Sequence, residues 1–514
     1  MSRKKLPIGI QTFREIREDN CYYVDKTAFA LRMIREGKAY FLSRPRRFGK
    51  SLFLDTLSEL FTGNEAMFRD LFCHDKWDWN IQYPVIRIGF AEGVMTSATE
   101  LKIRILDILA ENEQSLGLEE GSGEIPGRFI RLIQAAEARF GQRVVILVDE
   151  YDKPILDNLT KPDLAREMRD GLRNLYSIIK GQDAHIKFAF LTGVSKFSKV
   201  NIFSGLNNLA DITLSPDFSS ICGYTDADVD TVFAPELEGL NREEIRHWYN
   251  GYNWRGEAVY NPFDLLLLFR EREFRSFWFE TGTPTFLVDM LTERRVYLPE
   301  LDRLETSDRL LSTFEVGDIS TEALMFQSGY LTIAGEKKRG GNIAFLLTYP
   351  NHEVRSALTS SVMGAWIGNP HKAEQSRFAL YDALEINDFE RIREIFFSLY
   401  ASIPHDWFRK NDLDQFEGYY ASVFYATFAA LGMDIVPEDA SNHGRLDMAV
   451  QFNEQVYLFE FKVVEDQAEG KALTQIKEKK YADKYGSLQQ PIHLIGVEFS
   501  KKERNVVGFQ VEAA

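Results

Sequence analysis

The sequence predicts an α/β protein: a mostly parallel sheet wrapped by helices in the N-terminal part, and a second, smaller α/β domain at the C-terminal end. Two patterns predict this class. Up to about residue 225, short apolar runs alternate with amphipathic stretches, and after residue 417 a strand pattern returns. The 514 residues, of which 45% are hydrophobic, give enough apolar material for several buried cores.

The first domain is expected to span residues 1–225. Its strands are marked by short apolar runs, with amphipathic helices between them. The runs cover residues 39–42, 85–88, 144–148, 188–191 and 212–214.

After Gly223 the pattern becomes helical, which predicts a helical lid over residues 226–317. The aromatic cluster between Trp248 and Trp254 is expected to be core or domain interface. Residues 318–370 combine helix, hairpin and helix, an order that suggests a winged-helix-like segment. Its expected parts are a helix at 321–327, a strand at 330–333, a glycine-rich tip, a strand at 343–348 and a helix from Asn351.

The last expected domain, residues 371–514, begins with a helical lead-in of two helices between 375 and 403. A small α/β domain follows. Its expected elements are a helix at 417–432, strands at 447–452 and 456–462, a helix at 470–485 and a strand at 492–497.

Composition narrows the class of protein. Three widely spaced cysteines form neither a disulfide framework nor a CxxC metal site, which favours a reducing, cytoplasmic compartment. The apolar runs are too short to predict a membrane span or a secretory signal. A net charge of −16 argues against a general nucleic-acid coat protein, although it leaves room for a local basic groove.

The first chemical motif follows the expected strand at 39–42. Arg46-Arg47-Phe48-Gly49-Lys50-Ser51 leads into an apolar-periodic helix, which is the context of a phosphate-binding loop. Backbone N–H groups would wrap the phosphates of ATP, Lys50 would reach the β and γ phosphates, and Ser51 would ligate Mg²⁺. The pattern GxxxxGK[ST] asks for glycine where this chain has Arg44, and a basic loop capping an ordinary helix is the alternative.

Two carboxylates end the apolar run at 144–148. Asp149 could hold the hydration shell of Mg²⁺, and Glu150 could orient or deprotonate the attacking water. Thr192, at the end of the next run, could sense the γ-phosphate, and an ordinary turn explains it equally well. These residues strengthen the prediction of an ATP site.

A second motif lies near the C-terminus. Asp447 and Glu460 can meet at one edge of a hairpin, and strand alternation puts Glu460 and Lys462 on the same face. The two carboxylates would ligate Mg²⁺, with Mn²⁺ as a substitute, and Lys462 would stabilise charge at a scissile phosphate. Glu417 could add a ligand, and Gln475 could orient the substrate or a metal-bound water. Charged strand residues on a solvated face are the alternative.

Five segments together resemble the AAA-ATPase-like family of bacterial proteins, which is similar to AAA+/STAND-type P-loop ATPases. The resemblance covers roughly residues 5–290. It rests on the motifs Tyr23-Val24-Asp25-Lys26-Thr27, Arg44-Pro45-Arg46-Arg47-Phe48-Gly49-Lys50-Ser51, Val148-Asp149-Glu150-Tyr151-Asp152, Trp248-Tyr249-Asn250-Gly251-Tyr252 and Tyr260-Asn261-Pro262. Members of the family also carry arginine in place of the first loop glycine.

Residues 375–500 resemble the PD-(D/E)XK nuclease superfamily, through Glu417, the Gly444-Arg445-Leu446-Asp447 strand, Glu460-Phe461-Lys462 and the helix that bears Gln475. The resemblance implies a metal-dependent nuclease. We expect DNA in preference to RNA as its substrate, and the sequence leaves the choice between them open. We therefore expect an ATP-binding switch that gates a nuclease, and a homo-oligomer is compatible with it. The alternatives are a regulator that binds without catalysis, and a multi-subunit motor.

Overall fold

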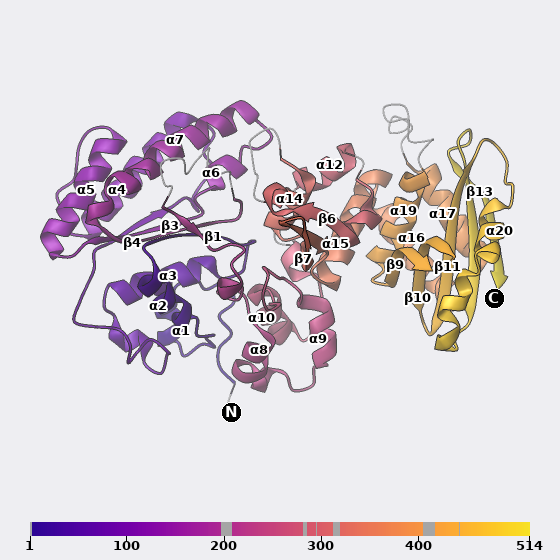
Figure 1. Ribbon diagram of the computed structural model, residues 1–514, viewed down its shortest axis with the longest axis horizontal. Helices are drawn as coiled ribbons and strands as arrows, with labels where there is room; N and C mark the ends of the chain where they lie inside the picture. The colour runs from indigo at the N-terminus through magenta and orange to yellow at the C-terminus, as the bar shows by residue number, and fades with distance from the viewer. Residues whose placement is uncertain are drawn as a thin grey trace. The chain divides into compact units, whose positions relative to one another are not determined.

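The computed structural model describes residues 3–196, 208–280, 285–294, 296–311, 319–403, 417–441 and 443–514. The chain forms two compact units. Unit 1 consists of Met1–Trp278 and Glu305–Asn351, and unit 2 consists of Phe279–Leu304 and His352–Ala514 (Figure 1). The chain therefore passes between the units three times. The boundaries expected from the sequence, at 225, 317 and 370, stay a prediction.

Unit 1 is built on a five-stranded sheet of order β2-β3-β4-β1-β5 in which every neighbouring pair is parallel. Full burial on both faces explains why β3 reads as the unbroken apolar run of residues 144–148. The strands are β1 (Ala39–Ser43), β2 (Val85–Gly89), β3 (Val144–Asp149), β4 (Ile186–Gly193) and β5 (Ala210–Asp211).

Helices cover both faces of this sheet. In Figure 1, α4, α5 and α7 lie on one face, and α2 and α3 lie on the other. Local sequence sets their ends: Ser97 caps α4 by accepting from the backbone N–H of Glu100. The helices are α1 (Phe13–Glu18), α2 (Thr27–Glu36), α3 (Lys50–Phe61), α4 (Ala98–Ser115), α5 (Ile125–Phe140), α6 (Lys153–Leu156) and α7 (Pro162–Gly181).

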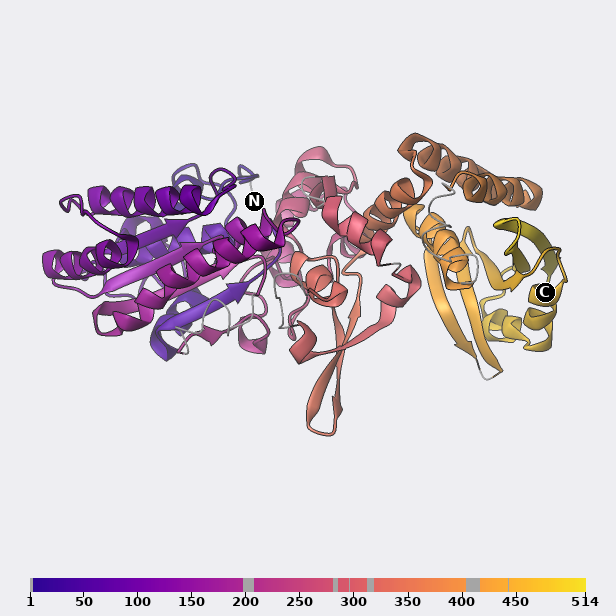
Figure 2. The same cartoon turned by 90° about the horizontal axis from the view of Figure 1, so that it is seen from above.

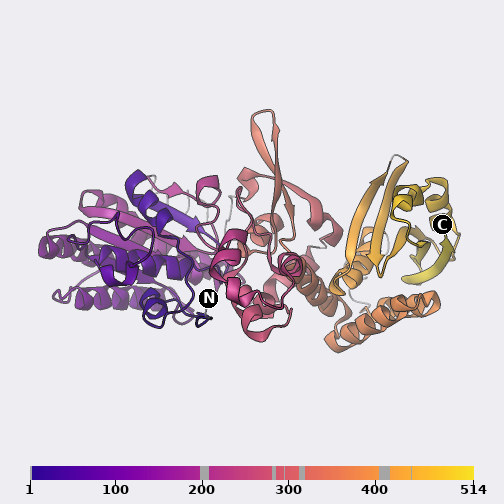
Figure 3. The same cartoon turned by 90° about the horizontal axis from the view of Figure 1, so that it is seen from below.

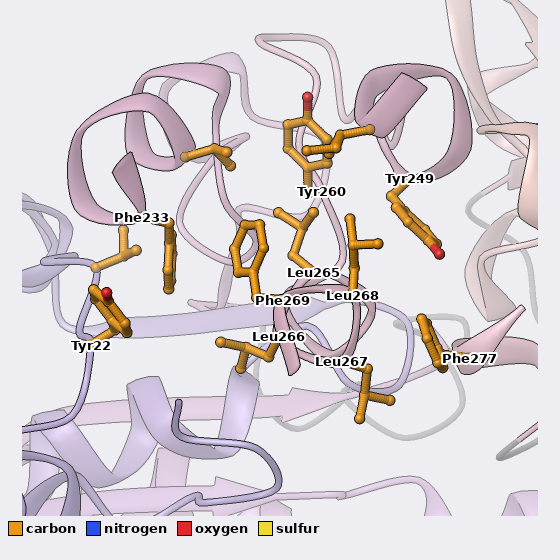
Figure 4. Packing of buried hydrophobic residues seen from close by; sticks show 13 residues of the cluster. Tyr22, Phe233, Tyr249, Tyr260, Leu265, Leu266, Leu267, Leu268, Phe269 and Phe277 are labelled. Atoms are coloured by element: carbon orange, nitrogen blue, oxygen red, sulfur yellow. The ribbon is translucent and has the colours of Figure 1, made fainter. Parts of the chain in front are cut away.

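The helices expected as a lid enclose an apolar core, to which Tyr22 and Val24 from the segment before α2 also contribute. Figure 4 shows Leu265 and Leu268 of α10 near Tyr260 and Tyr249, and Phe269 of the same helix beside Phe233. The expectation that the aromatic segment 248–254 is core is confirmed for Tyr249, Tyr252 and Trp254, which are buried. These helices are α8 (Asp226–Val232), α9 (Arg242–Tyr249), α10 (Pro262–Glu271) and α11 (Phe277–Glu280).

A three-stranded sheet of order β6-β8-β7 completes unit 1. Its β7–β8 hairpin projects as a long two-stranded arm in Figure 2. Gly329, with φ of 93°, ends the helix that precedes the hairpin. The elements are β6 (Leu304–Ser307), α13 (Asp308–Leu311), α14 (Thr321–Ser328), β7 (Thr332–Arg339) and β8 (Asn342–Thr348).

Unit 2 contains a mixed sheet of order β13-β12-β11-β10-β9, in which only β11 and β12 run parallel (orange to yellow in Figure 3). Aromatic residues of α19 pack on one face and α20 packs on the other. The strands are β9 (Asp434–Ser441), β10 (Gly444–Phe452), β11 (Gln455–Val464), β12 (Ile492–Ser500) and β13 (Asn505–Ala513); the helices are α12 (Thr285–Glu293), α15 (His352–Ile367), α16 (Pro370–Glu385), α17 (Phe389–Ala401), α19 (Glu417–Ala430) and α20 (Lys471–Glu478).

The expected fold class is confirmed, and several element boundaries were wrong. Residues 212–214 are not a strand, because pairing with β1 ends at Asp211. The helix expected at 470–485 ends at Glu478, since Lys480 takes a left-handed conformation with φ of 48° and a 3₁₀ segment, Tyr481–Leu488, follows. Among the described helices, none combines the length and the apolar character that crossing a membrane requires.

Candidate functional site

The loop between β1 and α3 is shaped by two left-handed residues. Arg47 has φ of 69° and Gly49 has φ of 88°. The backbone N–H of Phe53 donates to the carbonyl of Gly49, so α3 begins directly after the loop. The first N–H groups of a helix have no partner inside it and can bind an anion.

Lys50 lies inside this loop. Its ammonium group donates to the carbonyls of Arg44 at 3.0 Å and Pro45 at 2.9 Å. Burial lowers the pKa of Lys50, and the charge of Asp149 opposes that effect. A phosphate would supply the negative charge that a buried ammonium lacks, so the residues present fit a nucleotide phosphate. Ser51 is the next residue of α3.

The neighbouring loop side chains differ in their environment. Arg46 and Arg47 are exposed, and the guanidinium of Arg47 lies 4.6 Å from the ring centre of Phe263. Phe48 is buried against the rings of Tyr252 and Trp254. Any contact of Phe48 with a nucleotide would therefore come from its backbone.

Acidic residues follow β3 at the carboxyl edge of the same sheet. Asp149 ends the strand, and Glu150 follows it with φ of 49°. Burial and the charge of Asp149 raise the pKa of Glu150, which suits a residue that must accept a proton. Thr192 is fully buried in β4, and its hydroxyl donates to the carbonyl of Leu42 at 3.0 Å.

The second cluster forms where β10 and β11 pair. Met448 lies opposite Phe459, so Asp447 and Glu460 are the next positions along the two antiparallel strands. A carboxylate oxygen of Asp447 accepts from the backbone N–H of Phe461 at 2.7 Å. The hairpin thus brings the two acidic residues together, as the spacing predicted, but on neighbouring inner strands of the sheet and not at its edge.

Glu460 is the centre of this cluster and is only 1% exposed. Its Oε1 accepts from the ammonium of Lys462 at 3.1 Å and from the side-chain amide of Gln475 in α20. Its Oε2 is buried and has no hydrogen-bond partner within the described ranges. An unsatisfied buried carboxylate oxygen is costly, and a hard divalent cation such as Mg²⁺ would satisfy it.

Burial and mutual repulsion set the electrostatics of the cluster. Burial raises the pKa values of Asp447 and Glu460, and the charge of Asp447 adds to the rise at Glu460. Burial alone would lower the pKa of Lys462, but Glu460, Glu417 and Asp447 outweigh it and raise that pKa. The lysine therefore carries a positive charge beside the carboxylates.

Glu417, the first residue of α19, also contacts this lysine. Its Oε1 lies 3.3 Å from the ammonium of Lys462. The described residues contain no group of three or more acidic, histidine or cysteine side chains arranged to hold a metal ion. The geometry therefore places Glu417 beside the lysine, and Asp447 and Glu460 are the two acidic residues that could hold a cation.

Two further side chains of unit 2 belong to the surroundings of the cluster, and no sequence motif marked them. Tyr297 comes from the segment before β6. Its ring lies near Gly418 of α19, and the charges of Glu438 and Asp447 contribute to a raised pKa whose main cause is burial. Glu498 of β12 is 2% exposed and accepts four backbone N–H groups at the start of α20.

Comparison with known proteins matches both sites to families. Residues 7–203 match a family described as a predicted AAA-ATPase, and residues 415–509 match the PD-(D/E)XK nuclease superfamily. A protein of Azotobacter chroococcum mcd 1, described as an uncharacterized protein in the vnfD 5' region, is 61% identical over 514 residues, which is 100% of both chains. The chain belongs to the AAA-ATPase-like family.

The C-terminal part of this AAA-ATPase-like protein is a PD-(D/E)XK superfamily domain. Together, the two family matches include all the candidate site residues named from the sequence. The first match includes Arg46 to Ser51, Asp149, Glu150 and Thr192, and the second includes Glu417, Asp447, Glu460, Lys462 and Gln475. Tyr297 lies outside both. No solved structure matches the chain.

Proposed function

We propose that the protein binds ATP at the loop around Lys50 and cleaves DNA at the Asp447–Glu460 cluster, with cleavage gated by the nucleotide. The observation that carries the nuclease proposal is the environment of Glu460. Lys462 and Gln475 hold one oxygen of its carboxylate and leave the other, buried one unsatisfied. This arrangement supports a cation site next to a positive charge.

At the first site, Lys50 and the backbone of residues 46–51 would bind the phosphates of ATP. Ser51 and Asp149 would hold Mg²⁺. The raised pKa of Glu150 suits it to accept a proton from water. Thr192 would sense the γ-phosphate by turning its hydroxyl donor from the carbonyl of Leu42 to a phosphate oxygen. Arg46 and Arg47 would add positive charge at the mouth of the loop.

At the second site, Asp447 and Glu460 would hold Mg²⁺ or Mn²⁺, which polarises a phosphate when bound. Lys462 would stabilise negative charge that develops on the phosphate oxygens. Glu417 would keep Lys462 in place, and Gln475 would orient Glu460. These roles are the chemistry of phosphodiester hydrolysis.

The test is cleavage of plasmid and single-stranded DNA by the full chain in Mg²⁺ or Mn²⁺, with and without ATP. RNA of the same sequence serves as the competing substrate. We expect metal-dependent cleavage of DNA that changes on addition of ATP. Binding of ATP and DNA with no cleavage under any condition would favour a non-catalytic regulator instead.

A further inference from the structure

Arg44 occupies the position where the pattern GxxxxGK[ST] has its first glycine, and its side chain is 1% exposed. The guanidinium donates to four backbone carbonyls. One nitrogen reaches those of Ser43 at 2.8 Å and Thr213 at 2.9 Å, and the other reaches those of Phe218 at 3.2 Å and Ser219 at 3.4 Å. The side chain thus ties the loop to the segment that follows β5.

The guanidinium of Arg44 also makes a cation–π contact with an aromatic ring. Its carbon lies 4.1 Å from the ring centre of Trp254, which is 4% exposed. Trp254 in turn meets Phe48 of the loop edge-on at 5.4 Å. A cation over a desolvated indole is held more strongly than one at the surface, and although burial lowers the pKa of Arg44 to about 10, the group stays charged at neutral pH.

The backbone of Arg44 contacts the lysine of the proposed nucleotide site. Its carbonyl, together with that of Pro45, accepts the two hydrogen bonds of the Lys50 ammonium. The same residue therefore anchors the loop through its side chain and positions Lys50 through its carbonyl. A glycine could form the second contact but not the first.

We propose that Arg44 is a positioning residue for nucleotide binding: its buried guanidinium fixes the start of the phosphate-binding loop and so determines where Lys50 is held. The inference rests on the proposed binding of ATP at this loop. It has a counter-intuitive consequence. Arg44→Gly restores the glycine of the pattern, yet it should weaken ATP binding, because buried carbonyls lose their donors and Trp254 loses its cation.

The experiment titrates a fluorescent ATP analogue, with Mg²⁺, into the full chain carrying Arg44→Gly, Arg44→Lys or no substitution. We expect the wild type to bind, Arg44→Gly to lose about tenfold or more in affinity, and Arg44→Lys to lie between them, since lysine keeps the charge but not the fork of donors. Arg44→Gly would leave a guanidinium-sized space beside Trp254, because the wild-type side chain is buried there, so millimolar guanidinium should restore part of the affinity of this variant.

Arg128→Met is the matched control. Arg128 is also buried in unit 1, where it pairs with Glu113 of α4 at 2.6 Å, away from the loop. The substitution Arg128→Met should lower the melting temperature of the protein without changing its affinity for ATP. An equal loss of affinity in Arg128→Met and Arg44→Gly would overturn the proposal.

The remaining outcomes separate the two levels of inference. A wild type that binds no ATP overturns the proposed nucleotide site and this inference with it. Wild-type binding with unchanged or tighter binding in Arg44→Gly overturns the positioning role alone. If Arg44→Gly does not fold, Arg44→Lys decides: an affinity equal to that of the wild type refutes the role.

Discussion

Lys50 is a buried cation whose ammonium is satisfied by two loop carbonyls. We predict that Lys50→Ala abolishes ATP binding and leaves the fold intact, because it removes the charge that would pair with phosphate and little apolar area. Titration with a fluorescent ATP analogue measures the loss, and circular dichroism checks the fold. Lys180→Ala, at an exposed position of α7, is the control. Unchanged affinity in Lys50→Ala would refute the assignment of the loop.

Glu150 is expected to act after binding. Glu150→Gln removes the group that can accept a proton and keeps its size, so we predict normal ATP affinity with loss of phosphate release, about 10²-fold or more. A phosphate-release assay at saturating ATP measures the turnover. Wild-type turnover in Glu150→Gln would show that another residue activates the water.

Asp447, Glu460 and Lys462 should act as one unit. We predict that Asp447→Asn, Glu460→Gln and Lys462→Met each abolish metal-dependent cleavage, and that any double variant is no worse than a single one, since residues of one site lose activity non-additively. Plasmid nicking measures the rates. Glu454→Gln, at an exposed position of the β10–β11 turn, should leave them unchanged. Cleavage that survives Glu460→Gln would place the activity elsewhere.

Contacts of single side chains could be predicted from the sequence where the contacting residues are close along the chain. The spacing of Asp447, Glu460 and Lys462 follows from one hairpin, so their meeting could be predicted, although their roles stay predictions. Arg44 was harder, because the carbonyls that bind its side chain come from a segment about 170 residues away. Tyr297 carried no motif, since only tertiary packing brings it to α19.

Among the elements, α20 depends on an unusual cap. Glu498 accepts from the backbone N–H groups of Glu469, Gly470, Lys471 and Ala472 at 2.5 to 3.3 Å. A carboxylate is favourable there because it complements the positive end of the helix dipole. The cap also fixes the helix that carries Gln475.

We predict that Glu498→Gln lowers the free energy of unfolding by roughly 1–3 kcal/mol, because the amide offers one acceptor oxygen in place of two. Cleavage should fall as well, since Gln475 loses its fixed support. Urea denaturation measures the first effect, and Glu512→Gln is the control: it removes an exposed carboxylate that pairs with Lys477 and should cost about 0–1 kcal/mol. Equal stabilities of the two variants would contradict the cap.

The elements found from the sequence were the long, strongly patterned ones, such as β3 and α19. Short or edge strands were missed: β9 and β13 form the two edges of the C-terminal sheet, and β5 has only two residues. Edge strands are paired on one side, so their side chains are less uniformly apolar and give a weaker signal. Pairing partners, rather than local propensity, define them.

For the whole molecule, we predict that the two sites are coupled. ATP should change DNA affinity by a factor on the order of 5 to 150, and linkage requires DNA to change ATP affinity by the same factor. The measurement uses Glu460→Ala to prevent cleavage and Glu150→Gln to prevent hydrolysis. DNA affinity is determined with and without saturating ATP at one stated salt concentration.

The control for coupling adds Lys50→Ala to this background, which should remove the response to ATP while leaving DNA affinity in its absence unchanged. Equal DNA affinities with and without ATP, together with a cleavage rate indifferent to ATP, would mean two independent sites on one chain. The relative that is 61% identical over the full length shares both parts, so the same experiment applies to it.

Because the chain crosses between the units three times, neither unit is encoded by one continuous segment of the gene. This limits how the units can be exchanged by recombination. Residues 279–304 precede most of unit 2 in the gene yet belong to it, where Asp302 accepts a hydrogen bond from Tyr425 of α19 at 2.5 Å. A recombination event that replaced everything after residue 351 would join this segment from one parent to a sheet from another. The two units should therefore be inherited, and exchanged between genomes, as one block.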